Sequence, residues 1–317
     1  MKAKYEEGEV AIGLDLGGTN IKAGIVNREG KILRRMSVPT EAHQGGEAIL
    51  QRIGGVVRML ADEAAAQGWL VRGAGIGTAG QVDSTRGVVA GATANLPGWA
   101  GMDLGNRLAT LTGLPVLVDN DANAMAFGEA WVGAGRQWRD FVCITLGTGV
   151  GGGVVINRRP YRGRNGYAGE IGHHVIAGDG RPCNCGRSGC FEQYASVTAL
   201  MGMVRSLGSP ADKELSSPEA LFTAAGAGHG PALEVLGEYA RNIAVGLANL
   251  VHLFDPEGIV VGGAVSKQGE LLLAPVRLEL AGFLLPVFKQ APKVEIVAAQ
   301  LGNDGGVIGA AAAFFDF

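Results

Sequence analysis

The chain has 317 residues, of which 47% are hydrophobic and 18% are charged, and its formal net charge is −3. This length and composition indicate one large or two medium globular domains with sizeable cores. The weak negative charge, with lysines and arginines spread along the chain, argues against binding to nucleic acid or an anionic membrane. The charged first ten residues do not resemble a secretory signal, and no apolar run reaches the roughly 20 residues that span a bilayer. We therefore expect a cytoplasmic protein.

Apolar, strand-like segments alternate with helix-period segments, which predicts α/β architecture. The first three apolar runs, VAIGLDL, IKAGIV and KILRRMSV, are joined by short turns and predict three antiparallel strands. A helix over about residues 47–67 and a strand ending in GAGIGTAG follow, and then an irregular stretch. A helix over 104–111 and the strand PVLVD come next.

A second apolar and glycine-rich unit, FVCITLGTGVGGGVVIN, repeats the pattern of the first. Residues 142–156 match residues 12–26 as an apolar run, a turn of small residues and a further apolar run. We interpret this match as an internal repeat that contributes one hairpin turn from each half; two unrelated glycine-rich hairpins are the alternative. Helices are then expected over 195–207 and 232–253, followed by the strand GIVVGG, a helix, a strand near KVEIVA and a closing helix from Gly305.

The glycine-rich turns are candidates for phosphate binding. The sequence contains no G-x-x-x-x-G-K-[ST], so a P-loop is excluded. The two G-x-G-x-x-G strings, which begin at Gly75 and Gly147, lack the following helix and acidic residue of a Rossmann dinucleotide site. The turns DLGGTN and TLGTGVGG instead offer consecutive backbone N–H groups to anionic oxygens, with added hydroxyl groups from Thr19, Thr145 and Thr148. Asp15, at the end of its strand, is suited to hold Mg²⁺ or its water, although a turn-forming role is the alternative.

Two further clusters carry candidate chemistry. Asp119, Asn120, Asp121 and Asn123 lie where a strand passes into a helix, and α/β proteins place ligands at the carboxyl ends of strands. An N-cap role for Asp121 is the alternative. Cys183, Cys185 and Cys190 follow two histidines, and three cysteines with one histidine are a common ligand set of structural zinc. Reduced thiols or an adventitious disulfide are the alternative, whereas Cys143 lies in an apolar run and is expected in a core.

Five segments in this order, DLGGTN, VDNDANA, GEIGHH, CNCGRSGC and LGNDGGVIGAA, resemble the ROK family of sugar kinases and sugar-responsive repressors. The resemblance extends from about Glu9 to the end of the chain. It implies a duplicated actin-like, ribonuclease-H-like α/β fold of two lobes that binds ATP in an interlobe cleft and phosphorylates a hexose. The implied lobes are a smaller one over residues 1–119 plus a helix at about 303–317, and a larger one over 120–302 with a zinc loop at 173–190.

The resemblance also implies roles for individual residues. Asp121 would be the general base that takes the proton from the sugar hydroxyl as it attacks the γ-phosphoryl group. The residues implied at the phosphates, their Mg²⁺ or the adenosine of ATP are Asp15, Gly17, Gly18, Thr19, Thr145, Thr148, Gly149, Gly262 and Gly263. The residues implied at the sugar are Asn95, Asn120, Glu170, His173 and Glu192. The ligands implied for structural Zn²⁺ are His173, Cys183, Cys185 and Cys190.

Glucose is the expected acceptor because CFEQYAS resembles the glucokinase branch of the family, with N-acetylmannosamine, N-acetylglucosamine, mannose and fructose as alternatives. A DNA-binding repressor is disfavoured, because only about ten residues precede the first strand and no basic recognition helix is present. A non-catalytic sugar sensor is disfavoured by the presence of both Asp15 and Asp121. The family resemblance further implies a homodimer or homotetramer.

Overall fold

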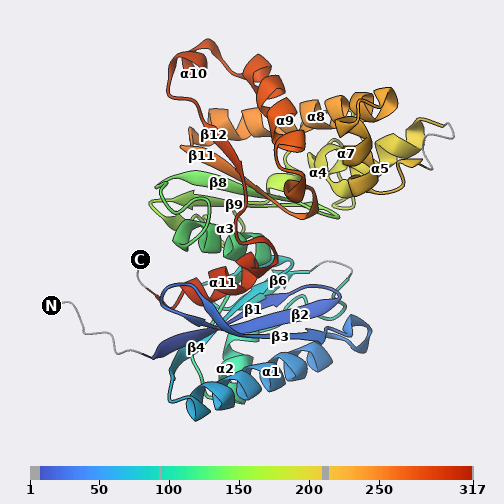
Figure 1. Ribbon diagram of the computed structural model, residues 1–317. Helices are drawn as coiled ribbons and strands as arrows, with labels where there is room; N and C mark the ends of the chain where they lie inside the picture. The colour runs from blue at the N-terminus through green and yellow to red at the C-terminus, as the bar shows by residue number, and fades with distance from the viewer. Residues whose placement is uncertain (1–7, 93–94, 209–213, 316–317) are drawn as a thin grey trace. The chain divides into compact units, whose positions relative to one another are not determined.

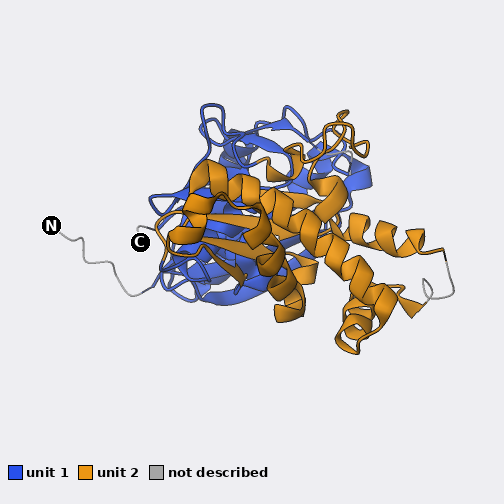
Figure 2. Ribbon diagram, turned by 90° about the horizontal axis from the view of Figure 1, so that it is seen from above, with its two compact units in different colours: residues 1–137, 153–169, 300–317 blue, residues 138–152, 170–299 orange. Residues whose placement is uncertain are grey.

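The computed structural model describes residues 8–92, 95–208 and 214–315 (Figure 1). The chain forms two compact units, coloured separately in Figure 2. The first unit contains residues 1–137, 153–169 and 300–317, and the second contains 138–152 and 170–299. The lobe boundary predicted after residue 119 stays a prediction; the helix that follows this residue lies in the first compact unit.

The first unit is built on a five-stranded sheet with the order β3-β2-β1-β4-β7. The first three strands along the chain pair in antiparallel fashion, as the sequence predicts, and β4 and β7 continue the sheet in parallel with β1. The strands are β1 (Glu9–Leu16), β2 (Asn20–Asn27), β3 (Ile32–Pro39), β4 (Leu70–Thr78) and β7 (Val116–Asn120). The stretch predicted to be irregular contains a short hairpin of β5 (Gln81–Asp83) and β6 (Val88–Gly91).

The two faces of this sheet are packed in different ways. Ile12 and Leu14 of β1 are fully buried in a hydrophobic core that includes α1 (Gly46–Ala66) and α2 (Leu104–Thr112). Gly13 points to the other face, where a Cβ atom would lie 1.9 Å from the carbonyl oxygen of Val307 in α11 (Gly305–Ala312). Gly75, its partner in β4, meets α11 in the same way. These glycines let the backbone of α11 approach the sheet opposite α1 (Figure 1), and α11 also packs against α3 (Asp121–Trp131).

A second five-stranded sheet has the order β10-β9-β8-β11-β12. As in the first sheet, three strands consecutive along the chain are followed by two strands that run parallel to the first of them. This shared order supports the internal repeat. The strands are β8 (Phe141–Leu146), β9 (Val150–Ile156), β10 (Arg159–Pro160), β11 (Gly258–Gly262) and β12 (Glu295–Ala298), and β9 runs from the second unit into the first.

The helices of the second unit pack around the long helix α8 (Gly230–Phe254). The helix predicted over 195–207 is present and begins at Val197, because the Ser196 side chain caps it by accepting the Ala199 N–H, and a separate short helix precedes it. The preceding short helix is α4 (Glu192–Ala195), and the predicted one is α5 (Val197–Ser206). The described residues of the unit also form α7 (Pro218–Gly226), α9 (Glu270–Phe283) and α10 (Pro286–Gln290). Within the described ranges no helix combines the length and hydropathy needed to cross a membrane.

Candidate active site and metal centre

The first predicted phosphate turn, residues 17–19, joins β1 to β2 and is held by a threonine that follows β3. The Thr40 hydroxyl donates to the Gly17 carbonyl at 2.7 Å, and the Thr40 amide donates to the Thr19 carbonyl at 2.8 Å. Within the turn, the Gly17 amide donates to the Asn20 carbonyl at 3.0 Å. Gly18 and Thr19 are exposed, so the tip of the turn is accessible to an anion.

Asp15 lies in β1 two residues before this turn, opposite Lys22 in the strand pair. Burial raises the pKa of Asp15 above its ordinary value of 3.8, and the positive charge of Lys22 opposes that shift. A Cβ atom at Gly306, in the first turn of α11, would lie 2.9 Å from the carboxyl carbon of Asp15. A partly buried carboxylate beside a predicted phosphate turn is a suitable partner for Mg²⁺, which proteins bind with few carboxylates plus phosphate oxygens.

Asn95, one of the predicted sugar residues, lies beside the same turn. Its Cβ atom is 3.4 Å from the position that a Cβ atom would take on Gly18, and its side chain is exposed. The first unit therefore brings a predicted sugar residue next to a predicted phosphate residue.

The second predicted phosphate turn, residues 147–149, joins β8 to β9 and is held in a similar manner. The Thr198 hydroxyl donates to the Thr148 carbonyl at 2.8 Å, and the Val197 amide donates to the Gly147 carbonyl at 2.8 Å. Thr148 is exposed at the tip. The hydroxyl of Thr145 accepts the Gly151 N–H at 3.2 Å, so this side chain braces the hairpin.

Two glycines at the end of β11 lie against the base of the second turn. Gly262 pairs with Thr145 of β8. Gly263 has a φ of 89°, and a Cβ atom there would lie 2.3 Å from the Leu146 carbonyl oxygen. A side chain is thus excluded both by the backbone conformation and by the neighbouring strand.

Glu192, another predicted sugar residue, contacts the second turn. Its Oε2 accepts the Val150 N–H at 2.9 Å, and a Cβ atom on Gly149 would come within 2.4 Å of the same oxygen. Glu192 begins α4 two residues after Cys190. Glu170 is exposed and directly precedes the 3₁₀ helix η2 (Ile171–His173).

The candidate catalytic loop lies where β7 passes into α3. Asn120 is the N-cap of this helix, and its Oδ1 accepts the amides of Ala122 at 2.9 Å and Asn123 at 3.2 Å. The alternative reading of Asp121 as the N-cap is therefore wrong; Asp121 is the first helical residue, and its Oδ1 accepts the Ala122 amide at 2.8 Å. The Asn120 side chain also donates one of its two amide hydrogens to the Gly80 carbonyl at 3.0 Å.

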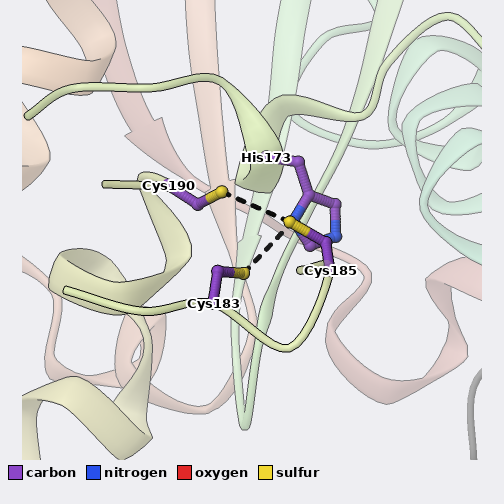
Figure 3. Close-up of side chains that lie close together, drawn as sticks. All are labelled: His173, Cys183, Cys185 and Cys190. Carbon is purple, nitrogen blue, oxygen red and sulfur yellow. Dashed lines mark hydrogen bonds between the residues drawn. The ribbon is translucent and has the colours of Figure 1, made fainter. Parts of the chain in front are cut away.

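The predicted zinc ligands come together in the second unit. His173, Cys183, Cys185 and Cys190 offer four donor atoms that lie within 4.8 Å of one another (Figure 3). The sulfurs of Cys185 and Cys190 are 3.5 Å apart, and the Cys183 sulfur lies 3.7 Å from His173 Nδ1. A tetrahedral zinc site with Zn–S bonds of about 2.3 Å separates its sulfurs by about 3.8 Å, so these residues fit zinc. None of the four cysteines forms a disulfide, and Cys143 is buried as expected.

Arg187 organises the cysteine loop, and the sequence reasoning did not identify it. Its side chain donates to the His173 carbonyl at 2.9 Å, and its carbonyl accepts the Cys183 amide at 2.8 Å. Hydrogen bonds from the Arg187 backbone and side chain lower the pKa of the Cys185 thiol to about 6, whereas burial raises the pKa of Cys190 to about 12. Since the thiolate is the metal ligand, a bound cation would favour deprotonation of both cysteines.

The chain is similar to known proteins over nearly its whole length. A family model described as the ROK family matches residues 11–316. The chain is 37% identical to a glucokinase of Thermotoga maritima over 313 residues, with 95% of each chain covered. It is 40% identical to a glucokinase of Streptomyces coelicolor over 315 residues, which cover 95% of this chain and 96% of the relative. Its structure is similar to that of a ROK family glucokinase from Streptomyces griseus in complex with glucose and AMPPNP, with a TM-score of 0.81, 38% identity, and 96% and 98% of the two chains covered.

Proposed function

The chain belongs to the ROK family, and we propose that it is an ATP-dependent glucokinase that converts glucose to glucose 6-phosphate. The observation that carries the choice of glucose is the similarity to glucokinases at 37% and 40% identity over 95% of the chain. The two predicted phosphate turns, the partly buried carboxylate of Asp15 and the loop that carries Asp121 support this proposal, because they offer the chemical groups that such a reaction needs.

For ATP, each unit contributes a turn whose backbone N–H groups suit phosphate oxygens. In the first unit we assign Gly17, Gly18 and Thr19 to this role, with Asp15 as the partner of the magnesium ion that accompanies ATP. In the second unit we assign Thr148 and Gly149 to the phosphates. We assign Gly262 and Gly263, at the end of β11, to the adenosine, and Thr145, which pairs with Gly262, to the adjoining part of the ATP site.

For the transfer itself, we assign Asp121 as general base. Its carboxylate takes the proton of the glucose hydroxyl while that oxygen bonds to the γ-phosphorus and the bond from this phosphorus to the oxygen of the leaving ADP breaks. Phosphoryl transfer depends mainly on positioning and on stabilisation of charge, and the Mg²⁺ carried by ATP neutralises the developing charge on the phosphates. The base contributes the smaller, proton-accepting part.

For glucose, we assign Asn95, Asn120, Glu170, His173 and Glu192 as partners of the hydroxyl groups. Carboxylates that accept from hydroxyls form charge-assisted and directional bonds. Zinc, held by His173 and the three cysteines, would have a structural role, because all four ligand positions are filled by the protein. The metal would fix the loop between Glu170 and Glu192. Nδ1 of His173 lies on the cysteine side, which leaves Nε2 as the nitrogen that we assign to the sugar.

An ADP-release assay with Mg-ATP tests this proposal against glucose, mannose, fructose, N-acetylglucosamine and N-acetylmannosamine. We expect glucose to give the highest kcat/KM. The Asp121→Asn variant is expected to lower kcat by at least about a hundredfold, since a general base contributes roughly 10²–10⁴ in rate. Asp62→Asn, on the exposed surface of α1, is the matched control for the loss of one carboxylate. Faster turnover of another sugar would change the assigned acceptor, and no turnover of any of them would refute the kinase assignment.

A further inference from the structure

An ion pair lies directly beside the candidate catalytic loop. Both Nε and Nη2 of Arg162 contact Oδ2 of Asp119, at 2.8 Å and 2.7 Å. The Asp119 side chain is 16% exposed and that of Arg162 is 34% exposed, so the pair is only partly in solvent. All of these atoms belong to the first compact unit.

The other oxygen of Asp119 is bound to the catalytic loop itself. Its Oδ1 accepts the Asn120 amide at 2.8 Å and the Nδ2 of Asn123 at 3.2 Å. Asn120 is the N-cap of α3, and the side chain of Asn123, in its first turn, is buried. The carboxylate of Asp119 therefore joins Arg162 to Asn120, immediately before Asp121, and to Asn123, two residues after it.

Arg162 is itself fixed in place by the segment that carries it. Its carbonyl accepts the Ala168 amide at 3.1 Å, and the neighbouring Tyr161 amide donates to the Val154 carbonyl at 2.7 Å. Within this segment Gly166 has a φ of 87° and packs against β5, where a Cβ atom would lie 2.3 Å from the Val82 carbonyl oxygen. The backbone of the segment that carries Arg162 is thus held in place, which limits the positions that the guanidinium group can take beside Asp119.

We infer that Arg162 is a positioning residue for the phosphoryl transfer: by holding Asp119, it fixes the first turn of α3 and with it the direction of the Asp121 carboxylate. This inference rests on the proposed function and on Asp121 as its base. Arg162 acts only through Asp119 and the helix start, so it affects the catalytic step more than the binding of ATP. A displacement of about 1 Å at a reacting group can lower a rate by about a hundredfold, which sets the upper limit of the expected effect.

The surroundings of Arg162 make a decisive experiment possible. Arg162 and Asp119 line a pocket of about 370 Å³, together with Leu117, Phe127 and Arg159. When Arg162 is replaced by alanine, this pocket gives a free guanidinium ion access to the vacated place beside Asp119. A role in fold stability alone would not be restored in this way, whereas a positioning role through the Asp119 carboxylate would.

The test compares Arg162→Ala, Arg162→Lys and the control Arg159→Ala in glucose phosphorylation. Arg159 lies on the same segment and lines the same pocket, with its guanidinium over the Phe127 ring. We expect kcat of Arg162→Ala to fall about 10- to 100-fold while KM for ATP stays within about twofold. Arg162→Lys should retain part of the activity, because one ammonium group replaces the two-pronged contact. Millimolar guanidinium, but not urea, should raise kcat of Arg162→Ala severalfold.

The outcomes separate the inference from the function on which it rests. If the wild-type protein does not phosphorylate glucose, the proposed function fails. If the wild-type protein does so, but kcat of Arg162→Ala equals that of the wild type or of Arg159→Ala, only the inference fails. A loss of kcat that guanidinium does not restore would mean that Arg162 only stabilises the fold. Should Arg162→Ala not fold, Asp119→Asn provides the same comparison. We expect kcat of Asp119→Asn to fall to a similar extent and not to rise when guanidinium is added. A wild-type kcat in Asp119→Asn would overturn the inference.

Discussion

Replacing the buried Thr40 by valine tests whether the first turn has to be held in place to bind ATP. Thr40 has no exposed surface, and its hydroxyl donates to the Gly17 carbonyl at 2.7 Å. Valine has nearly the same shape as threonine, and its backbone N–H can still donate to the Thr19 carbonyl. The substitution therefore removes one hydrogen bond and puts a methyl group in place of the hydroxyl. The Gly17 carbonyl then loses this donor.

The size of the effect follows from the cost of a buried acceptor without a donor, which is about 1–3 kcal/mol. ATP binding needs the turn in its ordered form. If about half of this cost reduces the stability of the ATP complex, the loss of binding free energy is about 0.5–1.5 kcal/mol. Because 1.4 kcal/mol corresponds to a tenfold change in affinity, KM for ATP should rise about two- to tenfold. KM for glucose should change less.

The assay measures kcat and both KM values, together with the thermal unfolding temperature of each variant. Ser37→Ala is the matched control, because Ser37 is an exposed hydroxyl residue on the same strand that Thr40 follows. The reasoning would be refuted by a Thr40→Val protein that unfolds at a lower temperature but binds ATP as the wild type does. In that case the hydroxyl would contribute to the fold and not to the ordering of the turn.

Two further predictions concern the metals. Cys185→Ser should lower the zinc content, measured by atomic emission, from about one ion per chain to near zero, and it should raise KM for glucose. The control Cys143→Ala, outside the cluster, should change neither quantity. A full zinc content in Cys185→Ser would contradict the assigned ligand set. Because burial raises the pKa of Asp15, the Mg²⁺ concentration needed for half-maximal rate should increase as the pH falls toward that raised value, and Asp15→Asn should need more Mg²⁺ but lose this pH dependence. Because the pKa of Asp15 is higher in the folded protein than in the unfolded chain, protonation of Asp15 stabilises the fold as the pH falls through the raised pKa toward 3.8. The expected loss of rate at low pH is therefore not caused by an unfolding that protonation of Asp15 drives. A wild-type Mg²⁺ requirement that is constant over this range would contradict the role of Asp15.

Sequence reasoning predicted the features that depend on local pattern. The three antiparallel strands and the match of residues 12–26 with 142–156 follow from periodicity, and the closeness of the three cysteines follows from their spacing along the chain. The choice of His173 over His174 as their partner came from the family resemblance. The N-cap role that the sequence offered as the alternative for Asp121 belongs to Asn120, and the pattern could not separate the two because both residue types are good N-caps. What decides is the backbone: Asn120 is extended, with φ of −65° and ψ of 148°, and helical geometry begins only at Asp121.

The contacts that sequence reasoning missed join residues far apart in the chain. Arg162 and Asp119 are separated by 43 positions, and Thr198 and Thr148 by 50. No periodicity links such positions, and a single arginine or threonine in a loop has many possible partners. Only the folded arrangement selects one, which is why the supports of the site were less predictable than its motifs.

The contacts that hold the two turns support their proposed role in binding phosphate. In the first turn the carbonyls of Gly17 and Thr19 accept hydrogen bonds from Thr40, and in the second turn the carbonyls of Gly147 and Thr148 accept from Val197 and Thr198. These hydrogen bonds turn the four carbonyls toward the protein, and we expect the tips of the turns to offer mainly N–H donors. Donors alone are poorly suited to a cation and well suited to the oxygens of a polyphosphate. Each unit thus reaches the same chemical result with a threonine that follows in the chain, although the threonine comes from the segment after β3 in one unit and from α5 in the other.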